Sequence, residues 1–296
     1  MHYFAVFSSS EQQHLSVDDG LALLSNAEIA AAADSVRWLH AGRAWEVPVA
    51  ETGLETLSQL RQQASQSGID INILPATGRR KKLLIADMDS TIITSESLDD
   101  MAEIANLAAA ITPITERAMR GELDFEAALD ERVALLRGQP SSLVDQALAA
   151  VKLTGGAECL VRTMRSHDAS CFLVSGGFTA ITGPVATMCG FDDHHANVLE
   201  TENGYLTGTV TKPVLDRESK LTFLDDYCAR LGITRDDAVC VGDGANDMVM
   251  LQAAGLGVAL KGKPLLREAV STQLNHTNLL GLLYLQGFSE AQFVTR

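Results

Sequence analysis

The sequence predicts an α/β fold whose main domain is a doubly wound parallel sheet. From residue 82 onward, four short apolar runs alternate with helical segments, and each run ends in Gly, Ser or Asp. Such alternation is typical of a parallel sheet with helices on both faces. A long helical insertion and a distinct N-terminal region complete the predicted fold class. The four runs are KLLIADMD at 82–89, SCFLVSGG at 170–177, AVCVGDG at 238–244 and LGVALKG at 256–262.

The first 78 residues follow another pattern, which predicts a small α+β domain. Strand-like and helical segments alternate there, and the linker PATGRRKK at 75–82 follows them. The four basic residues of this linker, 79–82, predict a solvated flank before the first strand of the main sheet. The predicted domains are therefore 1–78 and 79–296. The expected N-terminal segments are strands at 2–7 and 69–74, helices at Asp18–Val36 and Leu54–Ser67, and a hairpin at 37–49.

An insertion interrupts the main domain after its first strand. The chain between Thr91 and Gly155 is too long for a simple crossover between two strands, and most of it has a helical pattern. This pattern predicts a helical cap at about residues 95–152. A second insertion at 195–216 carries an Asn-Gly pair at 203–204 between alternating segments, which predicts a hairpin.

The composition narrows the class of partner. A net charge of −15 and a pI near 4.8 argue against nucleic acid or an anionic membrane as partner, because both need a basic surface. The five cysteines show no metal-binding spacing, which predicts reduced, buried thiols. No apolar run reaches the length of a membrane span, and the first residues lack the basic segment of a signal peptide. We therefore expect a cytoplasmic protein with a small-molecule partner, and a homodimer is one candidate assembly.

Polar side chains follow three of the predicted strands at the point where each strand ends. In open α/β sheets, ligands bind beyond the carboxyl ends of the strands. We therefore expect these side chains to meet at one edge of the sheet. They are Asp87 and Asp89 after the first strand, Ser175, Gly176 and Gly177 after the second, and Asp243, Gly244, Asn246 and Asp247 after the third.

The three carboxylates of Asp87, Asp89 and Asp243 are oxygen ligands of the kind that Mg²⁺ prefers. Like charges held close together raise at least one pKa or require a cation. A metal ion would neutralise this cluster and let an anionic phosphate approach an anionic nucleophile. Lys220, at the start of a helical pattern, is a candidate second cation.

Four motifs in this order make the sequence recognisable. DMDST at 87–91, VSGG at 174–177, Lys220 and VGDGANDM at 241–248 resemble the motifs of the haloacid dehalogenase superfamily of phosphotransferases. The similarity runs from about Lys82 to the C-terminus and is greatest to the phosphoserine phosphatases. It implies a haloacid dehalogenase-like core and Mg²⁺-dependent hydrolysis of O-phosphoserine to serine and phosphate, the last step of serine biosynthesis.

The resemblance also implies a role for each site residue. Asp87 would attack phosphorus to form an aspartyl-phosphate, and Asp89 would act as general acid and then general base. The implied metal ligands are Asp87, the backbone carbonyl of Asp89, and Asp243, with Asp247 supporting the ion from close by. The implied substrate-binding residues are Ser175, Gly176, Lys220 and Asn246 around the phosphoryl group, and Glu96, Met119, Phe125 and Arg132 in the cap.

The position of Arg132 gives an argument that depends on no family. At about 100° per residue, it falls about 20° from Phe125 and lies between Leu129 and Leu136 on one apolar helix face. A buried guanidinium without a partner is costly, so Arg132 either pairs with an internal acid or waits for an anionic ligand. The spacing to Phe125 favours a ligand carboxylate. Glu96 would then bind the substrate ammonium.

Two other functions remain open. A phosphotransferase with the same active site could move the phosphoryl group to another hydroxyl, such as that of homoserine. Alternatively, the chain could be an amino-acid sensor, because the order of segments in 1–78 resembles the small regulatory domains often joined to amino-acid enzymes. Other polar residues are assigned to solvent: Lys261 and Lys263 to a solvated loop, and His194 and His195 to a surface loop.

Overall fold

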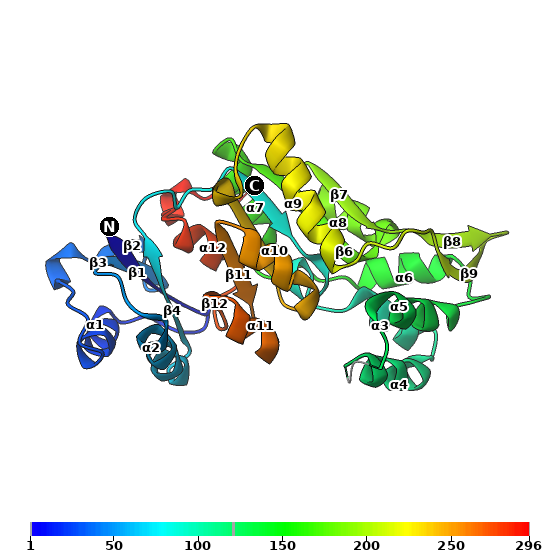
Figure 1. The fold of residues 1–296 in the computed structure, drawn as a ribbon, viewed down its shortest axis with the longest axis horizontal. Helices are drawn as coiled ribbons and strands as arrows, with labels where there is room; N and C mark the ends of the chain where they lie inside the picture. Colours follow the sequence, from blue (N-terminus) through cyan, green and yellow to red (C-terminus); the bar gives the residue numbers. More distant parts are fainter. Residues whose placement is uncertain (1, 120–121, 296) are drawn as a thin grey trace.

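The computed structural model describes residues 2–119 and 122–295, apart from the side chain of Met119. It contains a six-stranded sheet, a four-stranded sheet and a two-stranded hairpin. The four-stranded sheet lies at one end of the molecule, and the hairpin and a group of helices lie at the other end (Figure 1). In the described residues, no helix is long and apolar enough to cross a membrane.

The six-stranded sheet forms the centre of the molecule. Its strand order is β12-β11-β10-β5-β6-β7, and every neighbouring pair is parallel. All four predicted apolar runs supply strands of this sheet, namely β5, β6, β10 and β11. The strands are β5 (Leu83–Ala86), β6 (Ser170–Phe178), β7 (Asp193–Asn197), β10 (Ala238–Gly242), β11 (Leu256–Leu260) and β12 (Thr272–Leu274).

Helices cover both faces of this sheet, as predicted. Successive residues of β5 alternate between two hydrophobic clusters: Leu84 and Ala86 face one, and Leu83 and Ile85 face the other. This alternation is the period of two of an extended strand. One face packs against α7 (Ala157–Ser166), α8 (Thr179–Cys189) and α12 (Leu280–Leu285), and the other against α9 (Arg217–Leu231), α10 (Met248–Ala253) and α11 (Pro264–Ala269).

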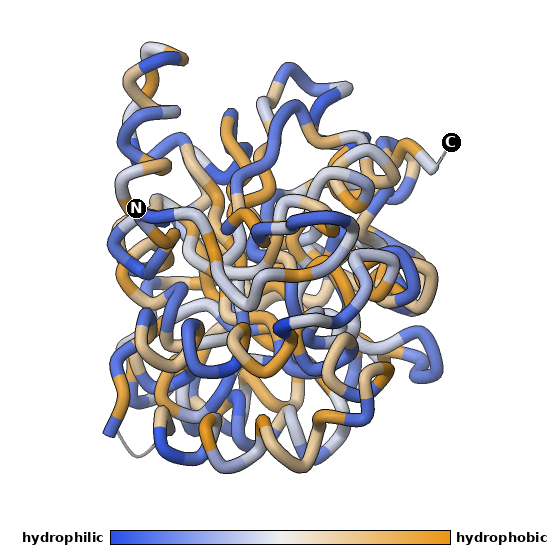
Figure 2. Tube along the Cα trace, turned by 90° about the vertical axis from the view of Figure 1, so that its right-hand side faces the viewer, coloured by the Kyte–Doolittle hydropathy of each residue, from blue (hydrophilic) through white to orange (hydrophobic). Residues whose placement is uncertain are grey.

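Four helices follow β5 at the position of the predicted cap, and their exact division from the core stays a prediction. Hydrophobic and hydrophilic stretches alternate along these helices (Figure 2). The predicted hairpin is present, with Asn203 and Gly204 at φ 52° and 83° in its turn. The elements are α3 (Ser97–Ile104), α4 (Ala108–Met119), α5 (Phe125–Ala134), α6 (Ser142–Ala150), β8 (Leu199–Glu202) and β9 (Tyr205–Val210).

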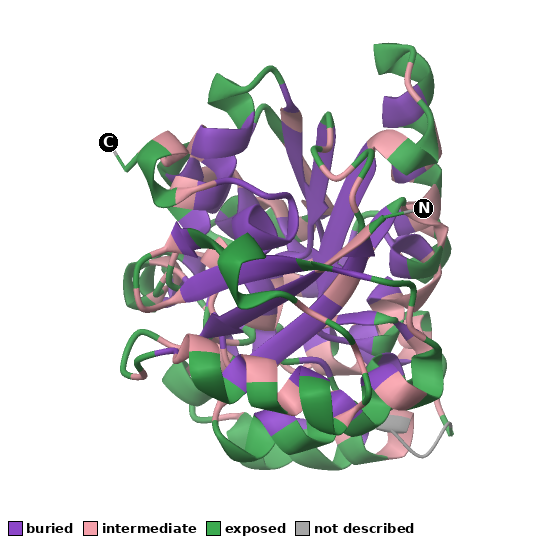
Figure 3. Ribbon diagram, turned by 90° about the vertical axis from the view of Figure 1, so that its left-hand side faces the viewer, coloured by how far each residue is buried: buried purple, intermediate pink, exposed green. Residues whose placement is uncertain are grey.

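The N-terminal region forms an antiparallel sheet in the order β2-β3-β1-β4, with two helices on its outer face. Its strands are mostly buried, whereas the helices expose their outer surfaces (Figure 3). The α+β architecture is as predicted, and the boundary at residue 78 stays a prediction. The elements are β1 (Tyr3–Ser9), α1 (Val17–Asn26), β2 (Arg37–His40), β3 (Ala44–Val49), α2 (Leu54–Gln66) and β4 (Ile69–Pro75).

The helix expected at Asp18–Val36 is too long. Helix α1 ends at Asn26, and Glu28 takes a left-handed backbone with φ 57°. Three later residues of the expected helix, Ile29, Ala31 and Val36, pack on the N-terminal hydrophobic cluster. Packing against the sheet therefore overrides the high helix propensity of the alanines at 30–33.

The N-terminal sheet is also covered on its inner face, by the main domain. Val6, Ala44 and Leu74 belong to the same hydrophobic cluster as Leu282 and Leu285 of α12. On the outer face, Ala5, Phe7 and Trp45 belong to the separate N-terminal cluster. Neighbouring residues along a strand point to opposite faces, which explains this division. Both faces of this sheet are therefore buried.

A polar contact joins β4 to the loop that follows β12. The carboxylate of Asp70 is buried and accepts hydrogen bonds from the backbone N–H groups of Asn275, His276 and Thr277, at 2.7, 3.0 and 2.7 Å. Nearby, the side-chain amide of Asn72 donates to the carbonyl of Gln273 and accepts from its N–H. The amide of Asn72 thus satisfies backbone groups at the edge of the main sheet, which would otherwise lack partners.

We expect Asp70→Ala to destabilise the whole chain by about 2–3 kcal/mol, because three buried N–H groups lose a charged acceptor. Urea unfolding followed by circular dichroism measures the change. The exposed Asp34 provides the control, and Asp34→Ala should stay within about 0.5 kcal/mol of the wild type. Equal stability of the two variants would contradict an anchoring role for Asp70.

The basic linker is only partly a solvated flank. Arg80 and Lys82 are exposed, as predicted, although the guanidinium of Arg80 also lies 3.8 Å from the ring centre of Phe288. The side chain of Arg79 is 8% exposed and pairs with the buried Glu46 at 2.8 Å. The prediction was wrong for Arg79 because the linker passes between the N-terminal sheet and the C-terminal segment, where this side chain finds carboxylate, aromatic and carbonyl partners.

Candidate active site

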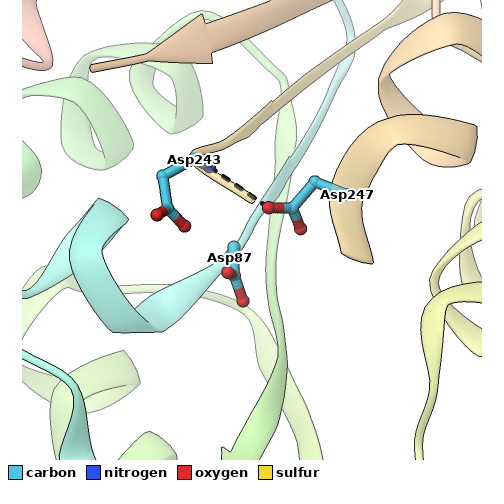
Figure 4. A group of neighbouring side chains, drawn as sticks. All are labelled: Asp87, Asp243 and Asp247. Carbon is cyan, nitrogen blue, oxygen red and sulfur yellow. Dashed lines mark hydrogen bonds between the residues drawn. The ribbon is translucent and has the colours of Figure 1, made fainter. Parts of the chain in front are cut away.

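Three aspartates from separate parts of the chain meet at the carboxyl edge of the main sheet. Asp87 follows β5, Asp243 follows β10, and Asp247 lies in the turn before α10 (Figure 4). One oxygen from each carboxylate lies within 4.8 Å of the other two. All three residues are buried, at 4%, 6% and 0% exposure. The ends of β5 and β10 therefore lie close together, as the sequence predicted.

The carboxylate of Asp247 is held entirely by the protein. One oxygen accepts hydrogen bonds from the N–H groups of Asp243 and Gly244, both at 3.1 Å, and the other contacts Lys220 Nζ at 2.5 Å. A side chain at Gly242 would overlap this carboxylate, so the close approach requires glycine. Because the protein engages both of its oxygens, Asp247 is suited to orient Lys220 and the backbone of Asp243.

Lys220 supplies the positive charge beneath the cluster. It is 1% exposed, and its Nζ lies 2.7 Å from Asp87 Oδ1 and 2.5 Å from Asp247 Oδ1. Burial acts to lower the pKa of Lys220, but Asp247 and Asp87 raise it above its ordinary value. Lys220 therefore stays protonated and locates the carboxylate of Asp87.

Positive charge at the site does not balance the negative charge. Burial raises the pKa of Asp87 well above its usual range, and the charge of Asp247 adds to this effect against the pull of Lys220. Burial likewise raises the pKa of Asp243, against the opposing charge of Lys263. Carboxylates whose charged form is disfavoured in this way need a cation, and their oxygen donors fit a hard divalent ion.

Asp89 lies between the core and the cap. Its two carboxylate oxygens accept from the N–H and the hydroxyl of Ser97, at 2.9 and 3.2 Å, at the start of α3. A Cβ at Gly177 would come within 2.7 Å of Asp89 Oδ2, so glycine is needed there. Burial, followed by the charge of Glu96, raises the pKa of Asp89 to about 7. A carboxyl group with this pKa can exchange a proton near neutral pH.

The C-terminal part of β6, where the register with β7 is irregular, brings Ser175, Gly176 and Gly177 to the same edge of the sheet, so the strand continues past the end that the sequence predicted. The buried Ser175 hydroxyl accepts from the N–H of Gly177 at 2.9 Å and retains its own proton for a ligand. Phe125, at the start of α5, lies 3.1 Å from the place that a Cβ on Gly176 would take. The cap therefore closes on this end of β6, and a side chain at Gly176 would push Phe125 away.

Arg132 also lies in the cap, half-buried on α5, and donates to the carbonyl of Ala128 at 3.2 Å. Across the described chain, no carboxylate lies within 4.0 Å of its guanidinium. Burial lowers the pKa of Arg132, while the charges of Asp99, Glu96 and Asp89 raise it. Of the two alternatives for Arg132, the geometry disfavours a direct internal ion pair.

The other predicted residues lie around this site, with one exception. Glu96 accepts from the hydroxyl of Ser90 at 2.8 Å and stays partly exposed. Asn246 lies half-buried beside Gly244, and its amide oxygen lies close to the place that a Cβ on Gly244 would take. Met119 is the last residue of α4, and its side chain lies outside the described residues.

Two polar residues at the site make contacts that the sequence analysis did not predict. Lys263 lies in a solvated loop, as expected, and its side chain is 59% exposed, but its Nζ also lies 3.2 Å from Asp243 Oδ2 and 3.9 Å from Glu96 Oε1. Its backbone N–H also donates to the carbonyl of Asp243. The available signal was its place just after the apolar run that forms β11, because such positions face the ligand edge of the sheet.

Asn197 is the second residue that was missed. It is buried at the end of β7, donates to the carbonyl of Gly176 at 2.8 Å and accepts from the N–H of Leu215 at 2.7 Å. No sequence motif marks it. The neighbouring His194 and His195 lie in β7 rather than in a surface loop, and they bond to opposite sides of the strand, to Thr182 and Tyr227.

Comparison with known proteins identifies the family. The family model for haloacid dehalogenase-like hydrolases matches residues 84–252. A phosphoserine phosphatase of Streptomyces coelicolor is 41% identical over 251 residues, which are 83% of this chain and 61% of that protein. One from Streptococcus thermophilus is 39% identical over 67% of this chain and 93% of its own length.

A solved structure extends the similarity to the whole fold. A haloacid dehalogenase family hydrolase of Salmonella enterica serovar Typhi has a TM-score of 0.85 at 27% identity, covering 96% of this chain and 98% of its own. This chain belongs to the haloacid dehalogenase-like hydrolases. Within that family it is similar to phosphoserine phosphatases, which confirms the resemblance found from the motifs, although the match spans about three fifths of the length of the Streptomyces protein.

The raised pKa of Asp89 predicts a pH-dependent stability in the metal-free protein. Between about pH 4 and 7 the folded protein keeps a proton that the unfolded chain has lost, so Asp89 destabilises the fold progressively as the pH rises. The stability advantage of Asp89→Asn over the wild type should therefore grow by up to about 1.4 kcal/mol per pH unit in this window. Urea unfolding with a chelator tests this, and a pH-independent difference would refute it.

The position of Asn197 predicts an effect on catalysis rather than on binding alone. Asn197→Ala leaves the carbonyl of Gly176 without the side-chain donor of Asn197, so the irregular end of β6 that carries Ser175 loses this support. We expect kcat to fall about 10-fold to 100-fold, since small displacements of positioning groups are costly. The exposed Asn26 gives the control, Asn26→Ala, which should keep full activity. Unchanged kcat in Asn197→Ala would assign Asn197 to folding alone.

Proposed function

We propose that this protein hydrolyses O-phosphoserine to serine and phosphate, with Mg²⁺ and through an aspartyl-phosphate at Asp87. The observation that carries the proposal is the pair of carboxyl groups at the carboxyl end of β5. One of them, Asp87, is buried against Lys220, and the other, Asp89, has a pKa of about 7. A nucleophile and a proton donor two residues apart are what hydrolysis of a phosphate ester requires.

The carboxylates of Asp87 and Asp243, with the backbone carbonyl of Asp89, would hold Mg²⁺. The excess negative charge and the oxygen donors of this cluster support that assignment. When bound, the ion supplies charge neutralisation for the phosphoryl group and its carboxylate nucleophile. Asp247 and Lys263 would orient these ligands from either side, because each contacts the backbone or the side chain of Asp243.

The residues of the chain would act in two steps. Asp87 attacks phosphorus, the bond from phosphorus to the serine oxygen breaks, and Asp89 gives its proton to that oxygen. Asp89 then takes a proton from the water molecule that attacks the aspartyl-phosphate, and this step releases phosphate and restores Asp87. Ser175 and Lys220 would hold the phosphoryl oxygens through both steps, since Lys220 is buried against Asp87 and Ser175 is buried at the carboxyl end of β6.

The cap would provide the preference for an amino-acid ester. Arg132 has no ion-pair partner among the described carboxylates. Its planar guanidinium could bind the two oxygens of the substrate carboxylate at once. Glu96, partly exposed and held by Ser90, would bind the substrate ammonium. Phe125 would cover the pocket where α5 meets Gly176.

Phosphate release from O-phosphoserine and from phenyl phosphate, each with Mg²⁺ and with chelator, tests the proposal. We expect Arg132→Ala to lower kcat/KM for O-phosphoserine about 30-fold to 100-fold, because one charge-assisted pair is lost. Its kcat/KM for phenyl phosphate should change less than about threefold, since that ester has no carboxylate. Asp87→Asn serves as the inactive blank, because an amide is a poor nucleophile.

Arg117 provides the matched control within the cap. It pairs with Glu131 at 2.7 Å and is partly exposed, so Arg117→Ala should leave the ratio between the two substrates unchanged. Equal losses on both substrates in Arg132→Ala would assign Arg132 to structure. If added homoserine captured most of the phosphoryl group, the protein would be a phosphotransferase instead. A cytoplasmic location, a homodimer and a regulatory role of residues 1–78 remain predictions.

A further inference from the structure

A cavity of about 400 Å³ lies between the N-terminal sheet and the main domain, and three arginines line it. Arg37 comes from β2, and Arg79 and Arg80 come from the linker. The remaining lining residues are Phe4, Ala76, Gly78, Gln286 and Gly287. No motif and no step of the proposed function uses this cavity. Strands β1 and β2, which carry its lining residues Phe4 and Arg37, lie at the end of the molecule that is opposite the cap helices (Figure 1).

The three guanidinium groups lie close together around Gly287. A Cβ on Gly287 would sit 3.4 Å from Arg79 Nη1 and 3.6 Å from Arg37 Nη2. Arg80 Nη2 reaches the carbonyl of the same glycine at 3.5 Å. Like charges gathered in this way repel each other unless an anion lies among them.

One carboxylate is available to three cations. Glu46 is fully buried and pairs with both Arg37 and Arg79, at 2.5 and 2.8 Å. Arg80 donates to neutral partners, the amide oxygen of Gln292 and the carbonyl of Gly287. Among the residues that the structure describes, no carboxylate lies within 4.0 Å of Arg80. Besides burial, the charges that lower the pKa of Arg80 are those of Arg37 and Arg79.

The neighbouring lysines show that this imbalance is specific. Lys82 pairs with Asp237 at 3.1 Å, and the charges of Asp236 and Asp237 act on Lys81. The chain has 38 acidic and 23 basic residues, so acidic partners are plentiful elsewhere. Lys81 and Lys82 thus have acidic neighbours, whereas the three arginines at the cavity share one carboxylate.

We propose that this cavity, with Arg37, Arg79 and Arg80, binds the phosphate group of a small molecule. Guanidinium groups are matched to phosphate because their planar N–H pairs bind two oxygens at once. The volume exceeds the need of a free phosphate ion, so a small phosphate monoester also fits. Inorganic phosphate and a monoester share this chemistry, and the experiment distinguishes them.

Tryptophan fluorescence gives a readout confined to this end of the protein. The chain has two tryptophans, Trp38 and Trp45, in the neighbouring strands β2 and β3. Trp38 follows Arg37 directly and is 41% exposed, so its emission should respond when the arginines bind an anion. Trp38→Phe should remove the response and so assign it to this residue.

The full chain with Mg²⁺ is titrated with inorganic phosphate, and potassium chloride at equal ionic strength is the blank. We expect a saturable fluorescence change in the wild type, with an affinity about tenfold lower in Arg80→Gln, since one charged contact is lost. Arg80→Lys should recover part of the affinity, because it keeps the charge. Lys82→Gln, the matched control that removes a charge already paired with Asp237, should bind like the wild type.

Methylphosphonate, which cannot be hydrolysed, identifies the source of the phosphate group. A response equal to that of phosphate supports a monoester ligand, and a response to phosphate alone supports the free ion. Equal titrations in wild type and Arg80→Gln, or no saturable change above the chloride blank, would overturn the proposal. Turnover of O-phosphoserine by Arg80→Gln is measured in parallel, and normal turnover shows that a lost response reflects this cavity rather than the active site.

Discussion

The central constraint on this structure is the concentration of negative charge at the carboxyl edge of the main sheet. One oxygen from each of Asp87, Asp243 and Asp247 lies within 4.8 Å of the other two, and Lys220 is buried in contact with Asp87 and Asp247. Like charges at this spacing tolerate burial only with fixed donors and a cation. Two local features meet this constraint. Asp247 accepts hydrogen bonds from two backbone N–H groups, and Gly242 leaves room for its carboxylate.

The same constraint explains why the cap is part of the site. The carboxyl group of Asp89 is oriented by Ser97, the first residue of α3, so a cap element positions the proposed proton donor. Phe125 closes on Gly176 from α5, and Arg132 lies on the same helix. In the proposed function, the core would supply the phosphoryl chemistry, and the cap would supply both the orientation of the proton donor and the charges that select a substrate.

Most of the fold and much of the site followed from sequence periodicity and strand ends. Apolar runs ending in Asp or Gly predict β5 and β10 because a parallel sheet needs buried strands, and its carboxyl edge collects their polar ends. Arg79 was expected to be solvated, because the sequence does not show which carboxylate or aromatic ring tertiary packing brings to a long basic side chain. Lys263 is solvated as expected, and only the folded chain shows that it also contacts Asp243. The helix at 18–36 was overextended because packing overrode propensity.

The N-terminal sheet is joined to the main domain by both apolar and polar contacts, which limits how it can act. Its inner face shares a hydrophobic cluster with α12, and Asp70 satisfies three N–H groups after β12. Removing it would expose that cluster and unpair that loop, so a deletion would confound stability with regulation. The N–H of Lys261 bonds to the last residue of β12, and Lys263 contacts Asp243 two residues later. The linker that carries Arg79 and Arg80 leads directly into β5, and Asp87 follows that strand, so a ligand held by these arginines could influence the aspartate cluster only if β5 or its neighbours have two arrangements.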